Sequence, residues 1–263
     1  MLYDNALLGI VYAKAYEITK DPLYKEIVEK IFEFILSEMI SEEGGFYAAL
    51  DAESEGEEGK YYVFEYREII DILGYELAEL YCNHYNITEK GNFEGKNIPN
   101  LIGKDFNSIN NIEKQKLETA RERLFAYRDN RIKPHRDEKI LTSWNGLMVG
   151  SLAYGGKVLD NMDYINRAKK AADFIIANSL DKEGHLLSIY IDGKSYNLGF
   201  LEDYAFLVYG LLTLYGVTKD QVYLNISKRL KEDMKKLFWD DKDGGYFYYS
   251  NISEKLILRP KDY

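Results

Sequence analysis

Cysteine, histidine, proline and tryptophan are all scarce in this chain. Its 263 residues include 1 Cys, 2 Trp, 3 His and 4 Pro. The lone Cys82 excludes a disulfide within the chain, a cysteine-based zinc site and a CxxC redox pair. Three histidines leave little material for a histidine-based metal centre. We therefore expect no metal and no other cofactor.

Concentrated positive charge and long apolar runs are missing as well. The chain has 34 Lys+Arg against 44 Asp+Glu, a net charge of -10. Nucleic-acid binding needs clustered Lys and Arg to neutralise phosphates, so we expect no such partner. No apolar run approaches the roughly 20 residues that cross a bilayer, and the start lacks the basic segment of a signal peptide. We expect a cytoplasmic protein without a membrane partner.

Tyrosine is abundant, and apolar residues recur mostly at helical spacing. There are 24 Tyr and 12 Phe, and no segment rich in Pro, Gly or Ser separates one part of the chain from another. Spacings of three and four residues, such as Leu23, Ile27, Ile31 and Phe34, predict amphipathic helices. The absence of a linker predicts a single domain over residues 1–263.

An internal repeat organises the helices. The glycines Gly44, Gly184 and Gly244 lie in equivalent turns. At the same number of residues before each glycine, a leucine lies near the start of a helix. About halfway lies a polar turn followed by a tyrosine. The unit is therefore helix, turn, helix, glycine turn and small β-hairpin. The equivalent leucines are Leu7, Leu147 and Leu207, and the tyrosines are Tyr24, Tyr164 and Tyr223.

Such units bury their apolar faces only by stacking into a solenoid or a closed ring. We expect residues 65–130 to hold a divergent fourth copy. Short connections make consecutive helices antiparallel, so the hairpins gather at one end of the ring, beside the N-termini of the inner helices. Backbone N–H groups and positive helix-dipole ends collect there, which makes this end the place to seek a ligand site.

Four long segments resemble the YyaL / spermatogenesis-associated protein 20 family. They are residues 44–63, 91–97, 133–148 and 199–206. The resemblance implies an all-α (α/α)6 toroid, six-hairpin glycosidase-like, with small β-hairpins between helix pairs. It also implies kinship with N-acylglucosamine 2-epimerases and with glycosidases. The family joins this toroid to a thioredoxin-like domain, and we expect no such domain within residues 1–263.

The chain also matches only part of that pattern. It begins inside what resembles an inner helix and stops at 256–263, where the family continues into further hairpins. The resemblance therefore predicts an incomplete, truncated toroid. An open ring leaves apolar helix faces exposed, so we expect self-association through the toroid edges.

Candidate catalytic residues are His135, Asp137 and Asp203. His135 carries an imidazole, the side chain most often used for general acid–base chemistry. Asp137 and Asp203 could supply the two carboxylates that glycoside chemistry requires. A solvated loop for the first two residues and helix capping for Asp203 are the alternatives, and they stay open.

Candidate substrate-binding residues flank these positions. Arg136 and Lys139 could hold an anion or a hydroxyl-rich ligand. Trp144 offers a flat apolar face to a sugar ring, and Asn145 offers both a donor and an acceptor. Tyr204 opens the next inner helix and could face the same ligand. A core tryptophan and a helix start at Ser143 are the alternatives.

The acidic hairpin loop supplies two more candidates, Asp51 and Glu53. A loop folded over the ring mouth would bring them to the ligand. Together with Glu55 they imitate the start of an EF-hand loop. Tyr62, however, stands where the bidentate glutamate belongs, so we do not expect a calcium site.

Two functions remain open. The first is a toroid that binds or processes a sugar-like small molecule by carboxylate and histidine chemistry, glycosidase-like or epimerase-like if it is an enzyme. The second is a non-catalytic toroid that binds a ligand or partner and works with a thioredoxin-like domain in redox or quality-control processes. Fold analogy alone does not decide between them.

Overall fold

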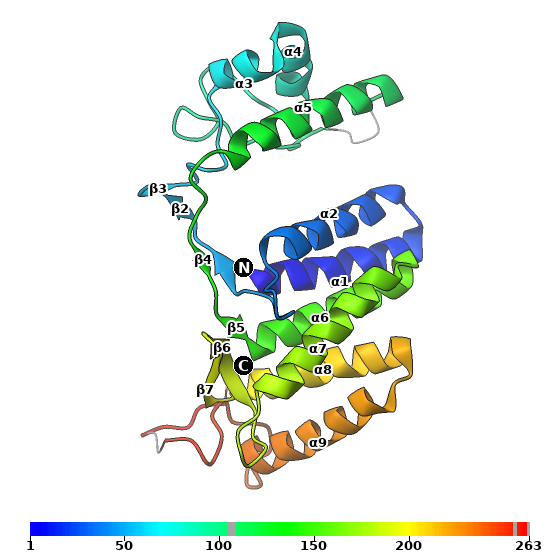
Figure 1. Ribbon diagram of the computed structural model, residues 1–263, viewed down its shortest axis with the longest axis vertical. Coiled ribbons are helices and arrows are strands. Elements are labelled where there is room, and N and C mark those ends of the chain that lie inside the picture. Colours follow the sequence, from blue (N-terminus) through cyan, green and yellow to red (C-terminus); the bar gives the residue numbers. More distant parts are fainter. Residues whose placement is uncertain (105–108, 255–256, 262–263) are drawn as a thin grey trace. The chain divides into compact units, whose positions relative to one another are not determined.

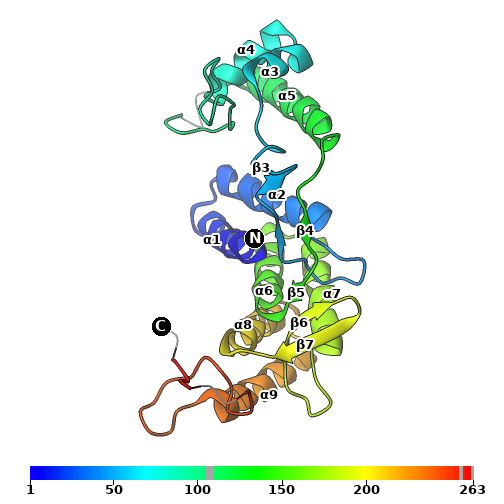
Figure 2. The ribbon, with the colours of Figure 1, turned by 90° about the vertical axis from the view of Figure 1, so that its left-hand side faces the viewer.

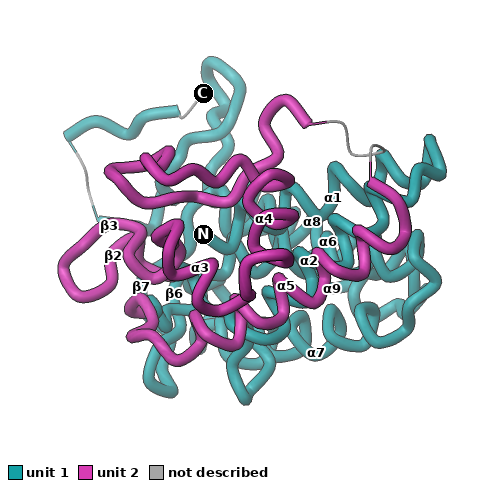
Figure 3. Tube along the Cα trace, turned by 90° about the horizontal axis from the view of Figure 1, so that it is seen from above, with its two compact units in different colours: residues 1–49, 136–263 teal, residues 50–135 magenta. Residues whose placement is uncertain are grey.

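The computed structural model describes residues 1–104, 109–254 and 257–261. The chain divides into two compact units (Figure 3). Unit 1 comprises residues 1–49 and 136–263, and unit 2 comprises residues 50–135. Unit 2 is thus inserted into unit 1 along the chain, and a single domain over residues 1–263 stays a prediction.

Unit 1 consists of helix pairs that follow the predicted repeat. Helices α1, α6 and α8 form one layer, with α6 between α1 and α8 (Figures 1 and 2). Helices α2, α7 and α9 pack against them as the second member of each pair. The bounds are α1 Leu2–Thr19, α2 Pro22–Glu38, α6 Thr142–Leu159, α7 Met162–Asn178, α8 Leu201–Thr218 and α9 Gln221–Phe238.

The turn within each pair uses the same chemistry in all three copies. The first helix ends at a residue with left-handed backbone, at Lys20, Asp160 or Lys219. The next residue caps the second helix: its side-chain oxygen accepts a hydrogen bond from a backbone N–H of the first turn. These capping residues are Asp21, Asn161 and Asp220.

The glycine turns also repeat. Isolated antiparallel bridges join Ile40 to Phe46, Leu180 to Leu186 and Trp239 to Tyr246. In the second copy the predicted hairpin is a regular one: β6 (Leu187–Ile191) pairs with β7 (Lys194–Leu198). Asp192 and Gly193 connect them with positive φ angles of 51° and 75°, as a tight hairpin turn requires. Strand β5 (Ile140–Leu141) adds to the edge of β6 and leads directly into α6.

Unit 2 has its own core, built from α3 (Tyr66–Leu73), α4 (Tyr75–His84) and α5 (Asn111–Asp129). A short antiparallel pair precedes them, β2 (Glu53–Ser54) with β3 (Glu57–Glu58). The remaining strands, β1 (Ala49–Leu50) and β4 (Arg136–Asp137), lie where the chain passes between the units. These helices lie within residues 65–130, and their assignment as a divergent fourth copy stays a prediction. Within unit 1, α1 packs directly on α6, so no helix pair stands between them.

Helices α6 and α8 touch backbone to backbone. A Cβ atom on Gly146 would lie 2.6 Å from the backbone of Phe206 and Leu207, and one on Gly210 would collide with the carbonyl group of Gly146. Only glycine permits this approach, so Gly146 and Gly210 determine the spacing of the two inner helices. Gly216 on the same helix α8 has no atom within 4 Å of its Cβ position.

We predict opposite effects for two alanine substitutions in α8. Gly210→Ala must push α8 away from α6 and should lower the free energy of unfolding by about 1–3 kcal/mol. Gly216→Ala lowers the backbone entropy of the unfolded chain and introduces no clash in the folded one. It should therefore raise the free energy of unfolding by about 0.5–1 kcal/mol. Urea denaturation followed by circular dichroism measures both. Equal effects of the two substitutions would contradict the backbone contact.

Candidate functional site

The N-termini of α1, α6 and α8 lie at the end of unit 1 that carries strands β5, β6 and β7 (Figure 1). This is the arrangement that the repeat predicted. Trp144 and Asn145 lie in the first turn of α6, and Asp203 and Tyr204 in the first turn of α8. Arg136, Asp137 and Lys139 precede α6 along the chain.

An aromatic pair spans the first turns of α1 and α6. The rings of Tyr3 and Trp144 lie 4.9 Å apart between centroids, with 58° between their planes. Both residues are half-buried, so part of their surface remains accessible. Trp144 was expected here. Tyr3 was missed, although the repeat register places it near the start of an inner helix, as it does Trp144.

Asp203 ties two inner helices together. Its Oδ1 accepts a hydrogen bond from the backbone N–H of Ser143 in α6 at 2.9 Å. Its Oδ2 accepts one from the N–H of Phe200, at the start of α8, also at 2.9 Å. The residue is 0% exposed. Burial raises the pKa of this carboxyl to about 6, although hydrogen bonds from Phe200, Ser188 and Ser143 act in the opposite direction.

Asn145 and Tyr204 each bind the hairpin of the preceding repeat. The amide of Asn145 accepts from the N–H of Phe46 at 2.8 Å and donates to its carbonyl oxygen at 3.0 Å. The hydroxyl of Tyr204 accepts from the N–H of Leu186 at 2.9 Å. Phe46 and Leu186 are equivalent repeat positions. Both side chains are buried, and burial raises the pKa of Tyr204 to about 12. They face the hairpins rather than solvent.

The charged residues before α6 are accessible and paired. Lys139 Nζ lies 2.7 Å from Asp137 Oδ2, and both side chains are about two-fifths exposed, at 42% and 37%. The Arg136 guanidinium lies 4.3 Å from the centre of the Tyr47 ring and 2.7 Å from a carboxylate oxygen of Glu138. These polar groups are partly exposed and paired with one another or with neighbours, and their contact with a ligand stays a prediction.

Three predicted residues belong to unit 2. His135 is exposed, and its carbonyl oxygen accepts from the N–H of Asp51 at 2.8 Å. Asp51 in turn accepts from the N–H of Glu53 at 3.2 Å. Glu53 is exposed and stands opposite Glu58 in the β2–β3 pair. Their predicted contact with a ligand stays a prediction.

Two further groups bear on metal and thiol chemistry. Cys82 is buried in unit 2, and burial raises the pKa of its thiol to about 11, as suits a small core residue.

Within the described part of the chain, Asp181, Glu183 and His185 have potential ligand atoms within 4.8 Å of one another. The carboxylate of Asp181 already accepts the backbone N–H groups of Glu183 and His185, which shapes the glycine turn. No helix among the described residues has the length and apolarity to cross a membrane.

A solved structure of low sequence identity shares this fold, and a second is similar over most of this chain. A glycosyl hydrolase of family 88 from Bacteroides vulgatus superposes with a TM-score of 0.52 at 18% identity, covering 97% of this chain and 54% of that one. A D-mannose isomerase gives a TM-score of 0.44 at 17% identity, over 94% of this chain and 63% of the other. The fold is that of the six-hairpin glycosidase-like toroids, as the resemblance implied.

Sequence relatives cover the whole chain, whereas no family model matches it. Spermatogenesis-associated protein 20 of Homo sapiens is 33% identical over 307 residues, covering 100% of this chain and 38% of the relative. The Mus musculus protein of the same name is 33% identical over 303 residues, with the same coverage. The chain thus spans about two-fifths of the length of these relatives. The resemblance to the spermatogenesis-associated protein 20 family is thereby confirmed over that part of the family's length.

Proposed function

We propose that this chain binds a carbohydrate at the end of unit 1 where the inner helices begin. The observation that carries the proposal is the accessible aromatic pair of Tyr3 and Trp144, whose centroids are 4.9 Å apart. Aromatic rings with one apolar face and a polar edge suit the C–H faces and hydroxyl edges of a sugar ring. The fold shared with a glycosyl hydrolase of family 88 supports the same class of ligand.

The polar groups around this pair suit hydroxyl recognition. Asp137 offers carboxylate oxygens as acceptors, while Lys139 and Arg136 offer cationic donors. Their partners, at 2.7 Å for the Asp137–Lys139 pair, hold them in place before a ligand arrives. The first N–H groups of the inner helices add donors and partial positive charge at the same end.

Buried Asp203, Asn145 and Tyr204 are better suited to positioning than to contact with a ligand. Both carboxylate oxygens of Asp203 are occupied by backbone N–H groups. A two-carboxylate glycosidase mechanism needs oxygen atoms that reach the scissile bond or a water molecule. We therefore propose Asp137 as the acid–base group of unit 1, with Asp203 placing the first turns of α6 and α8. The acid–base role of His135 stays a prediction.

Trp144 provides its own fluorescence probe for this proposal. The chain has 2 Trp, so Trp239→Phe leaves Trp144 as the only tryptophan. We expect titration with mixed mono- and disaccharides to change the emission of this variant. Trp144→Ala should weaken sugar binding at least about tenfold, because the aromatic surface is lost. Isothermal titration calorimetry measures the affinity.

A second aromatic pair supplies the matched control. Tyr12 and Tyr24 are half-buried, with centroids 6.0 Å apart, further along α1. Tyr12→Ala should leave sugar affinity unchanged. Equal weakening by Tyr12→Ala and Trp144→Ala, or no binding of any sugar tested, would refute the site.

The pH dependence of stability tests the positioning role of Asp203. In Asp203→Asn a side-chain NH2 group replaces one of the two accepting oxygens, so one buried backbone N–H loses its acceptor. This loss should lower the free energy of unfolding by about 1–3 kcal/mol. The folded pKa of about 6 lies above the ordinary value of 3.8. The stabilisation from this group is therefore fully present below pH 4 and is lost as the pH rises through 6. Urea denaturation from pH 4 to 7.5 should show the largest deficit of the variant at pH 4. A deficit that grows towards neutral pH would contradict this assignment.

A further inference from the structure

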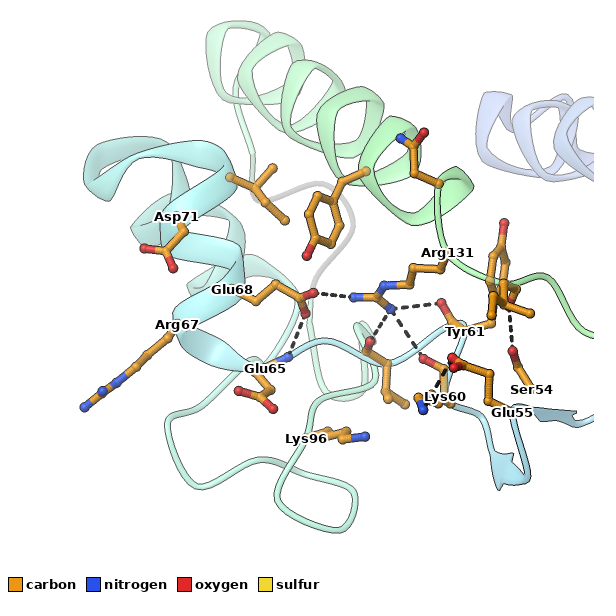
Figure 4. A pocket seen from close by; sticks show the side chains of 15 residues that line it. Ser54, Glu55, Lys60, Tyr61, Glu65, Arg67, Glu68, Asp71, Lys96 and Arg131 are labelled. Carbon is orange, nitrogen blue, oxygen red and sulfur yellow. Dashed lines mark hydrogen bonds and ion pairs between the residues drawn. The ribbon is translucent and has the colours of Figure 1, made fainter.

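Unit 2 contains a pocket that the proposed function does not use. Its volume is about 860 Å³, and all of its lining residues belong to unit 2. Small-molecule sites usually have volumes of roughly 300–1,000 Å³, so the pocket is large enough for a ligand of several rings. It lies between the β2–β3 segment, α3 and the end of α5 (Figure 4).

Arg131 ties several lining segments of the pocket together. Its guanidinium donates to the carbonyl oxygens of Tyr61 at 3.0 Å and of Val63 at 2.7 Å, and it lies 2.7 Å from the carboxylate of Glu68. Figure 4 shows this bridge from the end of α5 to α3. The group also stacks on Phe64, 4.5 Å from the ring centre. Arg131 is thus occupied in holding the walls together, and other residues must contact the ligand.

A loop held by asparagines carries Lys96 into the wall. Asn97 is 0% exposed, and its amide accepts from the N–H of Thr88 at 3.0 Å and donates to the Thr88 carbonyl oxygen at 3.1 Å. The backbones of Asn97 and Phe64 form an isolated bridge. Lys96 Nζ reaches a carboxylate oxygen of Glu57 at 3.3 Å. Residues 44–63 and 91–97, two of the segments that carry the family resemblance, therefore both contribute residues to this pocket.

The lining acids and bases are equal in number, which favours a polar ligand without net charge. A phosphorylated or otherwise anionic ligand would need an excess of cations, and an apolar ligand would need fewer charges. Carboxylates that accept and cations that donate suit a neutral ligand with many hydroxyl groups. Tyr127, which is 44% exposed, adds an accessible aromatic face. The acids are Glu55, Glu65, Glu68 and Asp71, and the bases are Lys60, Arg67, Lys96 and Arg131.

We propose that the inserted unit 2 holds a carbohydrate-binding site of its own, for a neutral oligosaccharide. The site stands independently of the one proposed for unit 1, because every lining residue lies within residues 50–135. The insertion then gives the chain a second place to hold a polymeric or branched sugar.

The test uses the full chain and three neutral trisaccharides: cellotriose, maltotriose and mannotriose. Lys96→Met and Tyr127→Ala should each weaken binding of at least one trisaccharide about tenfold in calorimetric titrations. Lys116→Met is the matched control. Lys116 lies on α5 in an exposed ion pair with Glu76 at 2.9 Å, away from this pocket. Its substitution should leave the affinity unchanged.

Two results would overturn the proposal. One is the absence of binding by all three trisaccharides at millimolar concentration. The other is an affinity that Lys96→Met and Tyr127→Ala change no more than Lys116→Met does. A Trp144→Ala variant separates the two sites, because it should leave the unit 2 affinity intact whether or not the unit 1 site exists. Circular dichroism confirms that each variant is folded.

Discussion

The direct backbone contact between α6 and α8 is the constraint on which the rest of unit 1 depends. Gly146 and Gly210 lack the side chains that would separate the two helices. Because the helices are so close, the short side chain of Asp203 in α8 reaches the N–H of Ser143 in α6 at 2.9 Å. That bond holds the first turn of α6, which carries Trp144. The placement of Trp144 in the proposed sugar site therefore depends on Gly146 and Gly210, which are not part of that site.

An amide side chain and a phenol side chain join successive repeats, and both bind the backbone of the preceding glycine turn. Asn145 in α6 binds the backbone of Phe46, and Tyr204 in α8 binds that of the equivalent Leu186. In each case an inner helix holds the glycine turn of the preceding repeat. An unpaired backbone N–H in this buried region would cost about 1–3 kcal/mol, so the pairing specifies how successive repeats dock. Asn145 and Tyr204 therefore have an architectural role, and their contact with a ligand stays a prediction.

The sequence predicted the local structure well and the long-range contacts poorly. The turn glycines and the caps at Asp21, Asn161 and Asp220 follow from short-range rules, and the structure confirms the repeat they imply. The insertion of unit 2 could not be inferred, because its helices have the same periodicity and no linker composition marks its ends. The network of Arg131 also escaped prediction, since Arg131 and Glu68 are 63 residues apart. The capping alternative for Asp203 was visible in sequence, whereas its bond across to α6 was not.

A hairpin turn is a favourable place for such an insertion. In unit 1 the N–H of Leu2 donates to the carbonyl oxygen of Ala48 at 2.9 Å, and the N–H of Ala48 donates to that of Asp137 at 3.1 Å. In unit 2 the N–H of Asp51 donates to the carbonyl oxygen of His135 at 2.8 Å. Both crossings of the chain are therefore fixed close to the point where the units divide. Loop-closure entropy grows only slowly with length, so 86 residues between held ends disturb the repeat little. The direct packing of α1 on α6 is therefore compatible with 86 residues inserted between them along the chain.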